Sequence, residues 1–431
     1  MIQYSMRIKI DRIVYPGKSM GKSGGKVVFT DHGLSGEEAE IEVIKDAKNH
    51  IQGRTVSVTG HSPHRVSPRC THYMVCAPYQ YIEPVYQSEL KARQIKDILG
   101  HHLSLDLEPV FRPSPRIWGY RNKAVFKIIW EEGSPSLAYN LPRSTDRFIR
   151  IDGCYLASEN MNVFLKELIR VVKERSLRWI DGVIVRENTK KEILAGIYHT
   201  ERPDAEDALL ALADIDGMSN VAGLVLVDRV TGKRKTMRGN EFFIERLRDK
   251  DLCIGIGSFF QVNTGQLSVL SEDIEKELAL TGTETLADLY CGVGTFGVLL
   301  SPKAGRVIGV ESDEENFYYM KRTIGMNGIT GFDARLSDCK NMIRTLFEEK
   351  VDAVIVDPPR KGMDPAVCLR LADSGPGMII YVSCDPATLT RDMKTLMSSY
   401  DVTKVYAYDF FPHTPHIETM TVMRRAGRKT K

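Results

Sequence analysis

Residues 377–386, with the sequence GMIIYVSCDP, decide the fold of this chain. Four of the six residues from Met378 to Ser383 are Met, Ile or Val, and none of the six is charged. A short apolar run of this kind is typical of a parallel strand that is covered on both faces. Asp385 then predicts a helix N-cap, with Pro386 at the first helical position. The segment therefore predicts a buried strand that leads directly into a helix.

Cys384 lies between this strand and this helix. In open α/β sheets, ligands bind at the carboxyl ends of the strands. A helix amino terminus also favours the thiolate, which is the reactive form of cysteine. Free cysteines are mostly buried and inert, however, so a structural role stays open at this point.

The rest of residues 258–431 alternates between strand and helix patterns, which predicts a parallel sheet. Strands are expected at 285–289, 306–310 and 351–356, and helices at 264–280 and 314–326. The last two strands, 402–409 and 418–425, read as an antiparallel end of the same sheet. The predicted fold class is therefore α/β.

A glycine-rich loop with the sequence DLYCGVGTFG occupies residues 288–297, after one expected strand and before a helix. Its glycines allow a tight turn and a close approach to a ligand. Glu311, nineteen residues beyond Gly292, ends the next strand, where an acid can accept hydrogen bonds from both ribose hydroxyls. The pair indicates an adenosine-type ligand, and a dinucleotide and S-adenosylmethionine both fit it.

Two later loops carry further polar residues. Asp357 ends a strand and precedes two prolines, which form a rigid turn that orients the aspartate. Arg360 follows where amino-group methyltransferases carry an aromatic residue, so that subclass is disfavoured. Residues 410–418, FFPHTPHIE, place an acid and two histidines in one loop, and taken singly these residues are structural.

The first two thirds of the chain have a different pattern. Short β-rich segments between residues 6 and 60, separated by glycine turns, suggest a small barrel of the OB type, which binds oligonucleotides in many proteins and is purely structural in others. From 83 to 257, helix and strand patterns mix. Residues 112–123, RPSPRIWGYRNK, place four cations among two aromatic rings. This composition suits single-stranded nucleic acid, and it equally suits a loop whose rings enter the core.

Composition adds few restrictions. The chain has 431 residues, 42% hydrophobic and 27% charged, with a net charge of +3, which neither requires nor excludes nucleic acid as a partner. No apolar run is long enough to span a bilayer, and the start lacks a signal-peptide pattern. Eight cysteines without an export signal are expected to be reduced thiols. We therefore expect a cytoplasmic protein without a membrane segment.

Taken together, the motifs closely resemble those of the RNA (uracil-5-)-methyltransferase family, which makes 5-methyluridine in ribosomal or transfer RNA. The matching segments are FFQVN at 259–263, DLYCGVG at 288–294, DPPRKG at 357–362, SCDP at 383–386 and FPHT at 411–414. The resemblance covers nearly the whole chain. It implies a TRAM-like β-barrel at 1–62, a central α+β RNA-binding domain at 63–257 with a cysteine loop at 70–79, and a Rossmann-like class I methyltransferase domain at 258–431.

The resemblance also implies roles for single residues. Cys384 is the thiolate that adds to carbon 6 of uracil, so that carbon 5 can attack the methyl group of S-adenosylmethionine. Glu418 is the base that then removes the carbon-5 proton. The target uridine has to leave its stack to reach the cysteine. The cofactor contacts by resemblance are Gln261, Tyr290, Glu311 and Asp357, together with Asp338 at the adenine end and Thr295, which stands where some members have Asn.

The expected partner is RNA, contacted by the barrel and by Tyr120 and Arg121. The barrel and the cysteine loop point to 23S ribosomal RNA, with a monomer as the acting unit. Alternatives are the same reaction on a transfer-RNA uridine, and a non-catalytic RNA-binding or ribosome-assembly factor. A DNA cytosine-5 methyltransferase is disfavoured because Ser383, and not proline, precedes the cysteine.

Many ribosomal members hold an iron–sulfur cluster with four cysteines. Cys70, Cys76 and Cys154 match three of these ligands, and Tyr79 stands at the position of the remaining one. Tyrosine is an unusual ligand for such a cluster. The cluster is therefore a candidate cofactor against which Tyr79 argues.

Overall fold

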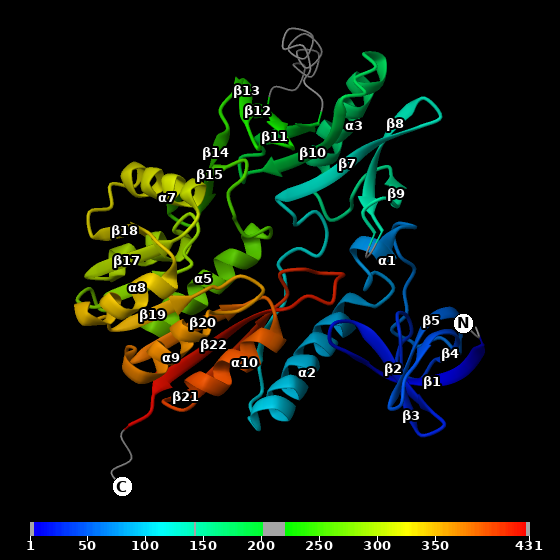
Figure 1. Cartoon of the computed structure of the whole chain (residues 1–431), viewed down its shortest axis with the longest axis horizontal. Helices are drawn as coiled ribbons and strands as arrows, with labels where there is room; N and C mark the ends of the chain where they lie inside the picture. The colour runs from blue at the N-terminus through cyan, green and yellow to red at the C-terminus, as the bar shows by residue number, and fades with distance from the viewer. Residues whose placement is uncertain (1–3, 142–143, 201–219, 428–431) are drawn as a thin grey trace.

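The computed structural model describes residues 4–141, 144–200 and 220–427 (Figure 1). Its amino-terminal part is a closed barrel with the strand order β1-β2-β3-β5-β4, which confirms the predicted small barrel. Alternate residues of β1, such as Ile8 and Ile10, point into the barrel and are buried. The strands are β1 (Ser5–Val14), β2 (Lys18–Ser23), β3 (Lys26–Thr30), β4 (Glu38–Asp46) and β5 (His50–Thr59).

The central part is a seven-stranded sheet with the order β13-β12-β11-β10-β7-β8-β9. Helix α3 (Glu159–Glu174) packs its apolar face, including Phe164 and Leu168, into the core of this sheet. The strands are β7 (Lys123–Glu131), β8 (Ser134–Asn140), β9 (Phe148–Ile151), β10 (Ile180–Glu187), β11 (Ile193–His199), β12 (Val221–Asp228) and β13 (Arg234–Gly239), and the hairpin β14 (Phe242–Leu247) and β15 (Lys250–Gly255) follows.

The carboxyl-terminal part is an eight-stranded sheet with the order β18-β17-β16-β19-β20-β22-β21-β6. Strand β20 (Met378–Ser383) is buried at every residue, as predicted, and lies between parallel β19 and antiparallel β22. The other elements are β16 (Thr285–Leu289), β17 (Arg306–Glu311), β18 (Phe332–Leu336), β19 (Ala353–Val356), β21 (Tyr400–Tyr408), β22 (Glu418–Arg425), α5 (Thr264–Leu278), α6 (Thr295–Leu300), α7 (Glu314–Met326), α8 (Cys339–Leu346), α9 (Pro365–Ser374) and α10 (Pro386–Leu396), with short 3-10 turns at Ser301–Lys303 and Phe347–Glu349.

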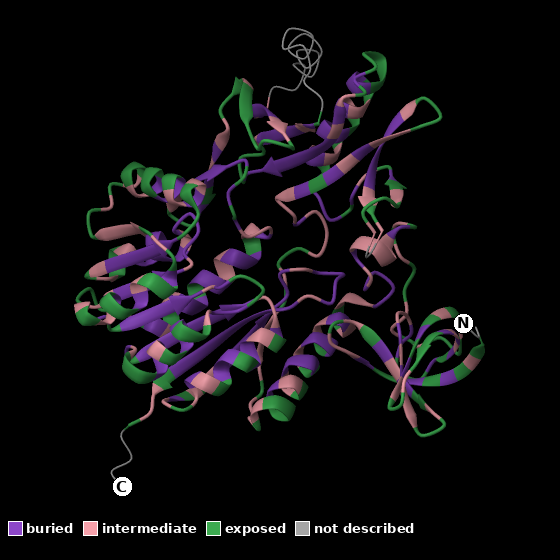
Figure 2. Ribbon diagram, in the orientation of Figure 1, coloured by how far each residue is buried: buried purple, intermediate pink, exposed green. Residues whose placement is uncertain are grey.

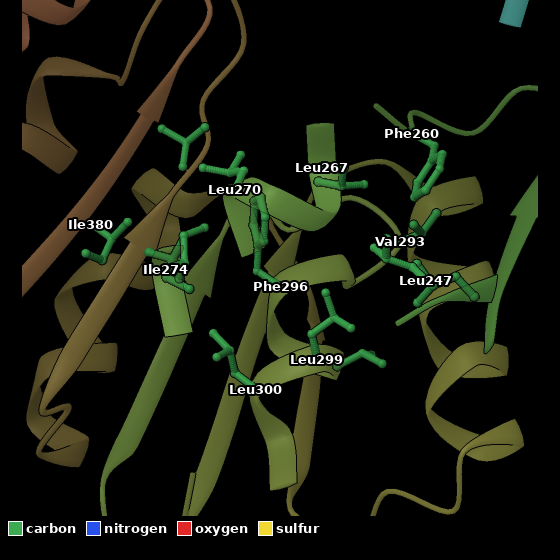
Figure 3. Close-up of a cluster of buried hydrophobic side chains, with 14 of the residues drawn as sticks. Leu247, Phe260, Leu267, Leu270, Ile274, Val293, Phe296, Leu299, Leu300 and Ile380 are labelled. Atoms are coloured by element: carbon green, nitrogen blue, oxygen red, sulfur yellow. The ribbon is translucent and has the colours of Figure 1, made fainter. Parts of the chain in front are cut away.

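Helices cover this sheet on both faces, and its inner strands β19 and β20 are buried at every residue (Figure 2). On one face, apolar residues of α5 and α6 pack against Ile380 of β20 (Figure 3). The labelled members of this cluster from the two helices are Leu267, Leu270, Ile274, Phe296, Leu299 and Leu300. The predicted α/β methyltransferase-type layering is therefore present.

Two elements that precede residue 258 also belong to this sheet. Strand β6 (Val110–Arg112) pairs in parallel with β21, with Val110 opposite Tyr406. Helix α2 (Pro84–Leu103) packs on α10, and its Ile95 and Leu99 join the core beneath the sheet. The packing therefore does not follow a linear division of the chain at 258. The sequence alone did not indicate β6, because its three residues are too few to show a pattern. The remaining short helix is α1 (Tyr73–Cys76).

Among the helices formed by the described residues, none combines the length and the hydropathy needed to cross a membrane.

Candidate active site

The register of two neighbouring strands brings Cys384 and Glu418 together. Ser383, the last residue of β20, pairs with Thr419 in antiparallel β22. The Thr419 hydroxyl also donates a hydrogen bond to the Ser383 carbonyl oxygen at 3.0 Å. Because Cys384 follows Ser383 and Glu418 precedes Thr419, the two residues lie opposite each other where the ladder ends.

Cys384 is half-buried, and the helix that follows it begins as predicted. The Asp385 carboxylate accepts hydrogen bonds from the backbone N–H groups of Ala387 at 2.8 Å and Thr388 at 3.2 Å. Burial raises the pKa of the Cys384 thiol to about 12. The nearby carboxylates of Glu418, Asp357 and Asp385 contribute to the rise, and Arg360 opposes it. The surroundings of the thiol therefore oppose the ionisation that a helix amino terminus favours.

Glu418 is only 1% exposed, and its Oε1 atom has no hydrogen-bond partner. Burial raises the pKa of its carboxyl well above the usual value, and Asp357 raises it further. A buried carboxyl with an unsatisfied oxygen destabilises the fold, and such groups are found mainly where they have a functional role. The position beside the thiol suits a group that takes up a proton from a bound substrate.

Asp357 connects this pair to a neighbouring pocket. It follows directly on β19, and its backbone N–H donates to the Leu289 carbonyl oxygen at 3.4 Å. Burial raises the pKa of its carboxyl, and a hydrogen bond from the Gln261 side chain opposes the rise. Asp357 is thus shared between the Cys384–Glu418 pair and the site expected to hold the cofactor.

A pocket beside Asp357 gathers four of the residues predicted to contact the cofactor: Gln261, Tyr290, Thr295 and Asp357. The glycine-rich loop forms its floor through left-handed backbone at Tyr290, with φ +60°, and at Gly294, with φ +82°. A Cβ atom at Gly294 would lie 2.9 Å from Met320 Cγ, so this glycine is needed for close packing as well as for its φ. The residues present fit an adenosine-type cofactor.

Glu311 holds the loop from the next strand. Its Oε2 accepts a hydrogen bond from the Gly292 N–H at 2.8 Å, and its Oε1 accepts from the N–H groups of Ser312 and Asp313, both at 2.7 Å. Both carboxylate oxygens of Glu311 therefore accept hydrogen bonds from backbone N–H groups at the end of β17, and Glu311 lies beside the pocket lining and not in it.

Asp288 is a site residue that the sequence reasoning missed. It is fully buried, its Oδ2 accepts from the Gly297 N–H at 2.8 Å, and its Oδ1 has no partner. Burial raises the pKa of Asp288 to about 7, helped by Asp357 and Glu311. An acid inside the apolar strand TLADL was the available signal.

Asp338 lies beside the pocket and not in its lining. It is exposed, and its carboxylate caps α8 by accepting from the Lys340 N–H at 2.9 Å. Its charge, after burial and Cys339, contributes to the raised pKa of the Tyr290 phenol. Asp338 is therefore near the predicted adenine end.

Helix α2 holds the loop that leads to Glu418. Lys91, with no exposed surface, donates hydrogen bonds from Nζ to the Asp409 carboxylate at 2.6 Å and to the Phe411 carbonyl oxygen at 3.1 Å. The Gln87 side chain accepts from the His413 N–H at 2.9 Å. These contacts set the path of the loop, and no feature of the sequence of α2 predicted them.

Tyr120 does not offer a ring for base stacking in this structure. It is 6% exposed, belongs to the central core, and donates a hydrogen bond to the Pro412 carbonyl oxygen at 3.2 Å. Of the two interpretations of residues 112–123, the buried ring therefore holds for Tyr120. Arg121 is half-buried, and its Nε has no partner. Trp118, the other aromatic residue of this segment, stacks on His413, with ring centroids 3.7 Å apart.

Cys70, Cys76 and Cys154 form a second group of thiols, which we call the cysteine triad. The Gln80 side chain donates to Cys70 Sγ at 3.3 Å, and the Tyr139 hydroxyl donates to Cys154 Sγ at 3.5 Å. Burial, followed by the charges of the other two thiols, raises the pKa of Cys76 to about 12. The three cysteines are thus neighbours.

The triad does not fit an iron–sulfur cluster. Tyr79 is 1% exposed and packs in a different apolar cluster, where its hydroxyl accepts a hydrogen bond from Gln94 at 3.4 Å. Across the part of the chain that the structure describes, no group of three or more His, Cys, Asp or Glu side chains could hold a metal ion. We therefore assign no chemistry to a cluster.

Comparisons with known proteins agree with this geometry. The family model described as tRNA (Uracil-5-)-methyltransferase matches residues 85–426. Uncharacterized RNA methyltransferases of Bacillus cereus and Clostridium tetani are each 30% identical, over 98% and 96% of this chain and 96% and 95% of their own lengths. The crystal structure of Pyrococcus abyssi tRNA (uracil-54, C5)-methyltransferase in complex with S-adenosyl-L-homocysteine matches with a TM-score of 0.75 and 26% identity, over 97% of this chain and 100% of that chain.

Proposed function

Since this chain belongs to the tRNA (uracil-5-)-methyltransferase family and is an RNA methyltransferase, we propose that it methylates carbon 5 of a uridine in 23S ribosomal RNA. The observation that carries the proposal is the juxtaposition of Cys384 and Glu418 beside the pocket that contains Gln261, Tyr290 and Asp357. A thiol and a carboxyl on adjoining strand ends are the two groups that this reaction needs.

In the proposed mechanism, the Cys384 thiol loses its proton to solvent and the sulfur forms a bond to carbon 6 of a flipped uracil. The electron pair of the C5=C6 double bond moves onto carbon 5 and the carbonyl oxygen as an enolate, which makes carbon 5 nucleophilic. S-adenosylmethionine, when bound, supplies the methyl group that carbon 5 takes up. The Glu418 carboxylate then removes the carbon-5 proton, and the electron pair of that C–H bond restores the ring double bond as the Cys384 thiolate leaves.

The charges around the thiol support a reaction that begins only with substrate in place. Burial and then three acids raise the pKa of Cys384, and Arg360 is the cation that opposes them. An uncharged thiol is the less nucleophilic form, so it is protected from unwanted chemistry. The addition step therefore has to include loss of the thiol proton.

Cys70, Cys76 and Cys154, which match cluster ligands of ribosomal members, support ribosomal RNA as the substrate. The barrel does not distinguish ribosomal RNA from transfer RNA, because the match to the archaeal tRNA methyltransferase extends over 97% of this chain. We propose that the barrel, within residues 1–62, and the central domain, within 63–257, both bind that RNA. The second candidate is a transfer-RNA uridine, which the similarity to the archaeal tRNA (uracil-54, C5)-methyltransferase favours.

The test uses RNA from a host strain that lacks this protein. The purified protein is incubated with labelled S-adenosylmethionine and either 23S rRNA or bulk tRNA, and the modified nucleosides are mapped by mass spectrometry. We expect new 5-methyluridine in the ribosomal RNA. Labelling of tRNA alone would select the second candidate, and absence of 5-methyluridine from both would overturn the proposal.

A further inference from the structure

We propose that Tyr15 of the amino-terminal barrel forms a wall of the uridine pocket and positions the flipped nucleotide, so that the barrel completes the reaction centre. This inference rests on the function proposed above. Residues 15–17 form the turn between β1 and β2, and nothing in their sequence, Tyr-Pro-Gly, marks them as part of a site.

The barrel is docked on helix α2. The Gln94 side chain donates a hydrogen bond to the Ile13 carbonyl oxygen at 3.3 Å, and Arg12 forms an ion pair with Asp97 at 3.6 Å. Gln94 is 4% exposed, so this contact is inside the molecule. The same helix holds the loop before Glu418 through Lys91, which links the barrel and the loop to one support.

The turn at residues 15–17 also contacts the loop before Glu418 directly. Gly17 has φ +87°, and a Cβ atom there would lie 2.9 Å from Pro415 Cβ and 3.3 Å from Tyr79 Cε1. The backbone of the turn therefore packs tightly on Pro415, three residues before Glu418. A larger residue at position 17 would push the barrel away from the loop.

The packing of Tyr15 itself shows where its side chain lies. Tyr15 is half-buried and packs against a large apolar cluster, whose members include Ile417 and Leu389. Ile417 directly precedes Glu418, and Leu389 lies in the first turns of the helix after Cys384. Tyr15 therefore borders the core that also supports the two segments carrying the reacting groups, and Asp385, Cys384 and Glu418 are near enough to act on its phenol electrostatically.

The phenol is also poised to donate. Burial raises its pKa, and the nearby Asp385, Cys384 and Glu418 raise it further, so the hydroxyl keeps its proton. Among the residues that the structure describes, it makes no hydrogen bond. A free donor at this place can bind a carbonyl oxygen or a hydroxyl of a flipped uridine, while the ring excludes water from the thiol.

The experiment measures covalent adduct formation between the full-length protein and RNA that contains 5-fluorouridine, together with RNA affinity and melting temperature. We expect Tyr15→Phe to slow adduct formation by about tenfold, as for the loss of one hydrogen bond. Tyr15→Ala should slow it further. RNA affinity and melting temperature should stay unchanged in Tyr15→Phe, because the ring and its packing remain.

Tyr4→Phe is the matched control, because Tyr4 lies just before β1 and its hydroxyl bonds Asp46 on the outside of the barrel. Its adduct rate should equal that of the wild type. Gly17→Val is a second variant that leaves Tyr15 intact and should also slow adduct formation, by displacing the turn from Pro415.

Wild-type adduct rates in both Tyr15 variants would overturn the proposal, as would a lower melting temperature in Tyr15→Ala with an unchanged rate in Tyr15→Phe. A wild-type protein that forms 5-methyluridine but shows no dependence on Tyr15 removes this inference alone. A wild-type protein that forms neither 5-methyluridine nor an adduct removes the proposed function and the inference with it.

Discussion

The reaction centre and the cysteine triad both contain half-buried thiols, and burial raises the pKa of Cys384, Cys70 and Cys76, yet the neighbours of these thiols differ. The sulfurs of Cys70 and Cys154 accept hydrogen bonds from Gln80 and Tyr139. Cys384 instead faces Glu418, whose Oε1 is unsatisfied, and adjoins a pocket through Asp357. The role of a cysteine therefore depends on whether the groups around it still have unpaired atoms that can act on a substrate, and not on its burial or pKa alone.

The largest expected effect is on Cys384. Cys384→Ala should reduce methyl transfer to RNA by at least about 1,000-fold, because the covalent route is lost. Transfer of label from S-adenosylmethionine is the measurement, and an unchanged melting temperature shows that the fold persists. Normal turnover by this variant would place the thiol outside the reaction.

Glu418→Gln separates the two halves of the reaction. The variant keeps the thiol but loses the base, so turnover should fall by about 100-fold or more while a protein–RNA adduct accumulates. Denaturing gels detect the adduct as a band of reduced mobility. The double variant with Cys384→Ala is the control and should form none; rapid release of methylated RNA by Glu418→Gln would assign the base elsewhere.

The pH dependence tests the raised pKa values. With the pKa of Cys384 at about 12, the thiolate fraction rises up to about tenfold per pH unit across neutral and mildly alkaline pH. Glu418 also has a raised pKa and works as a base only when ionised, so release of the product, a later step than adduct formation, should also quicken as the pH rises. Single-turnover adduct formation should therefore increase from about pH 6 to about pH 9. A rate that is flat over this range would mean that bound RNA lowers the thiol pKa before addition.

Lys91→Met tests the support beneath the reaction centre. It leaves Asp409 buried without its cation, and the free energy of unfolding should fall by about 3–5 kcal/mol. Lys96→Met on the same helix breaks an exposed pair with Glu108 and should leave the free energy of unfolding nearly unchanged. Denaturant titration of both variants gives the comparison, and equal losses would contradict a special role for the buried pair.

The smallest effect is expected in the cysteine triad. Cys70→Ser should change methyl transfer by less than about twofold, because a half-buried thiol with no metal to hold contributes little. Treatment with an iron chelator should also leave the rate unchanged. Elemental analysis of anaerobically purified protein is the direct check. Iron bound in proportion to protein would contradict the prediction, because it would show that the triad holds a metal.

Much of the molecule followed from local patterns. The apolar run before Cys384, the glycine-rich loop and the turn after Asp357 correctly predicted β20 and the class I architecture. Gln261, Tyr290 and Thr295, which are predicted to contact the cofactor, line one pocket. The predicted family and enzyme class are confirmed as well. These features are readable because each depends on residues that are close together in the chain.

Other features depended on distant partners. The sequence around Tyr120 suits an exposed stacking ring, but Pro412 and the central core bury it. The sequence around Cys384 suits a thiolate, but Asp357 and Glu418 come from other strands and reverse the charge balance. Strand β6 carries too few residues to show a period, and only pairing with β21 makes it a strand.

The sequence by itself determined the strand-to-helix turn that carries Cys384, the cofactor loop and the family, because local spacing sets backbone conformation and residue chemistry. Only the tertiary structure decided the surroundings that raise the pKa of that cysteine, the support of the Glu418 loop by Lys91 and the position of Tyr15 beside the reaction centre. Desolvation and electrostatic interaction depend on what surrounds a group in space, and those neighbours come from segments that are tens to hundreds of residues apart.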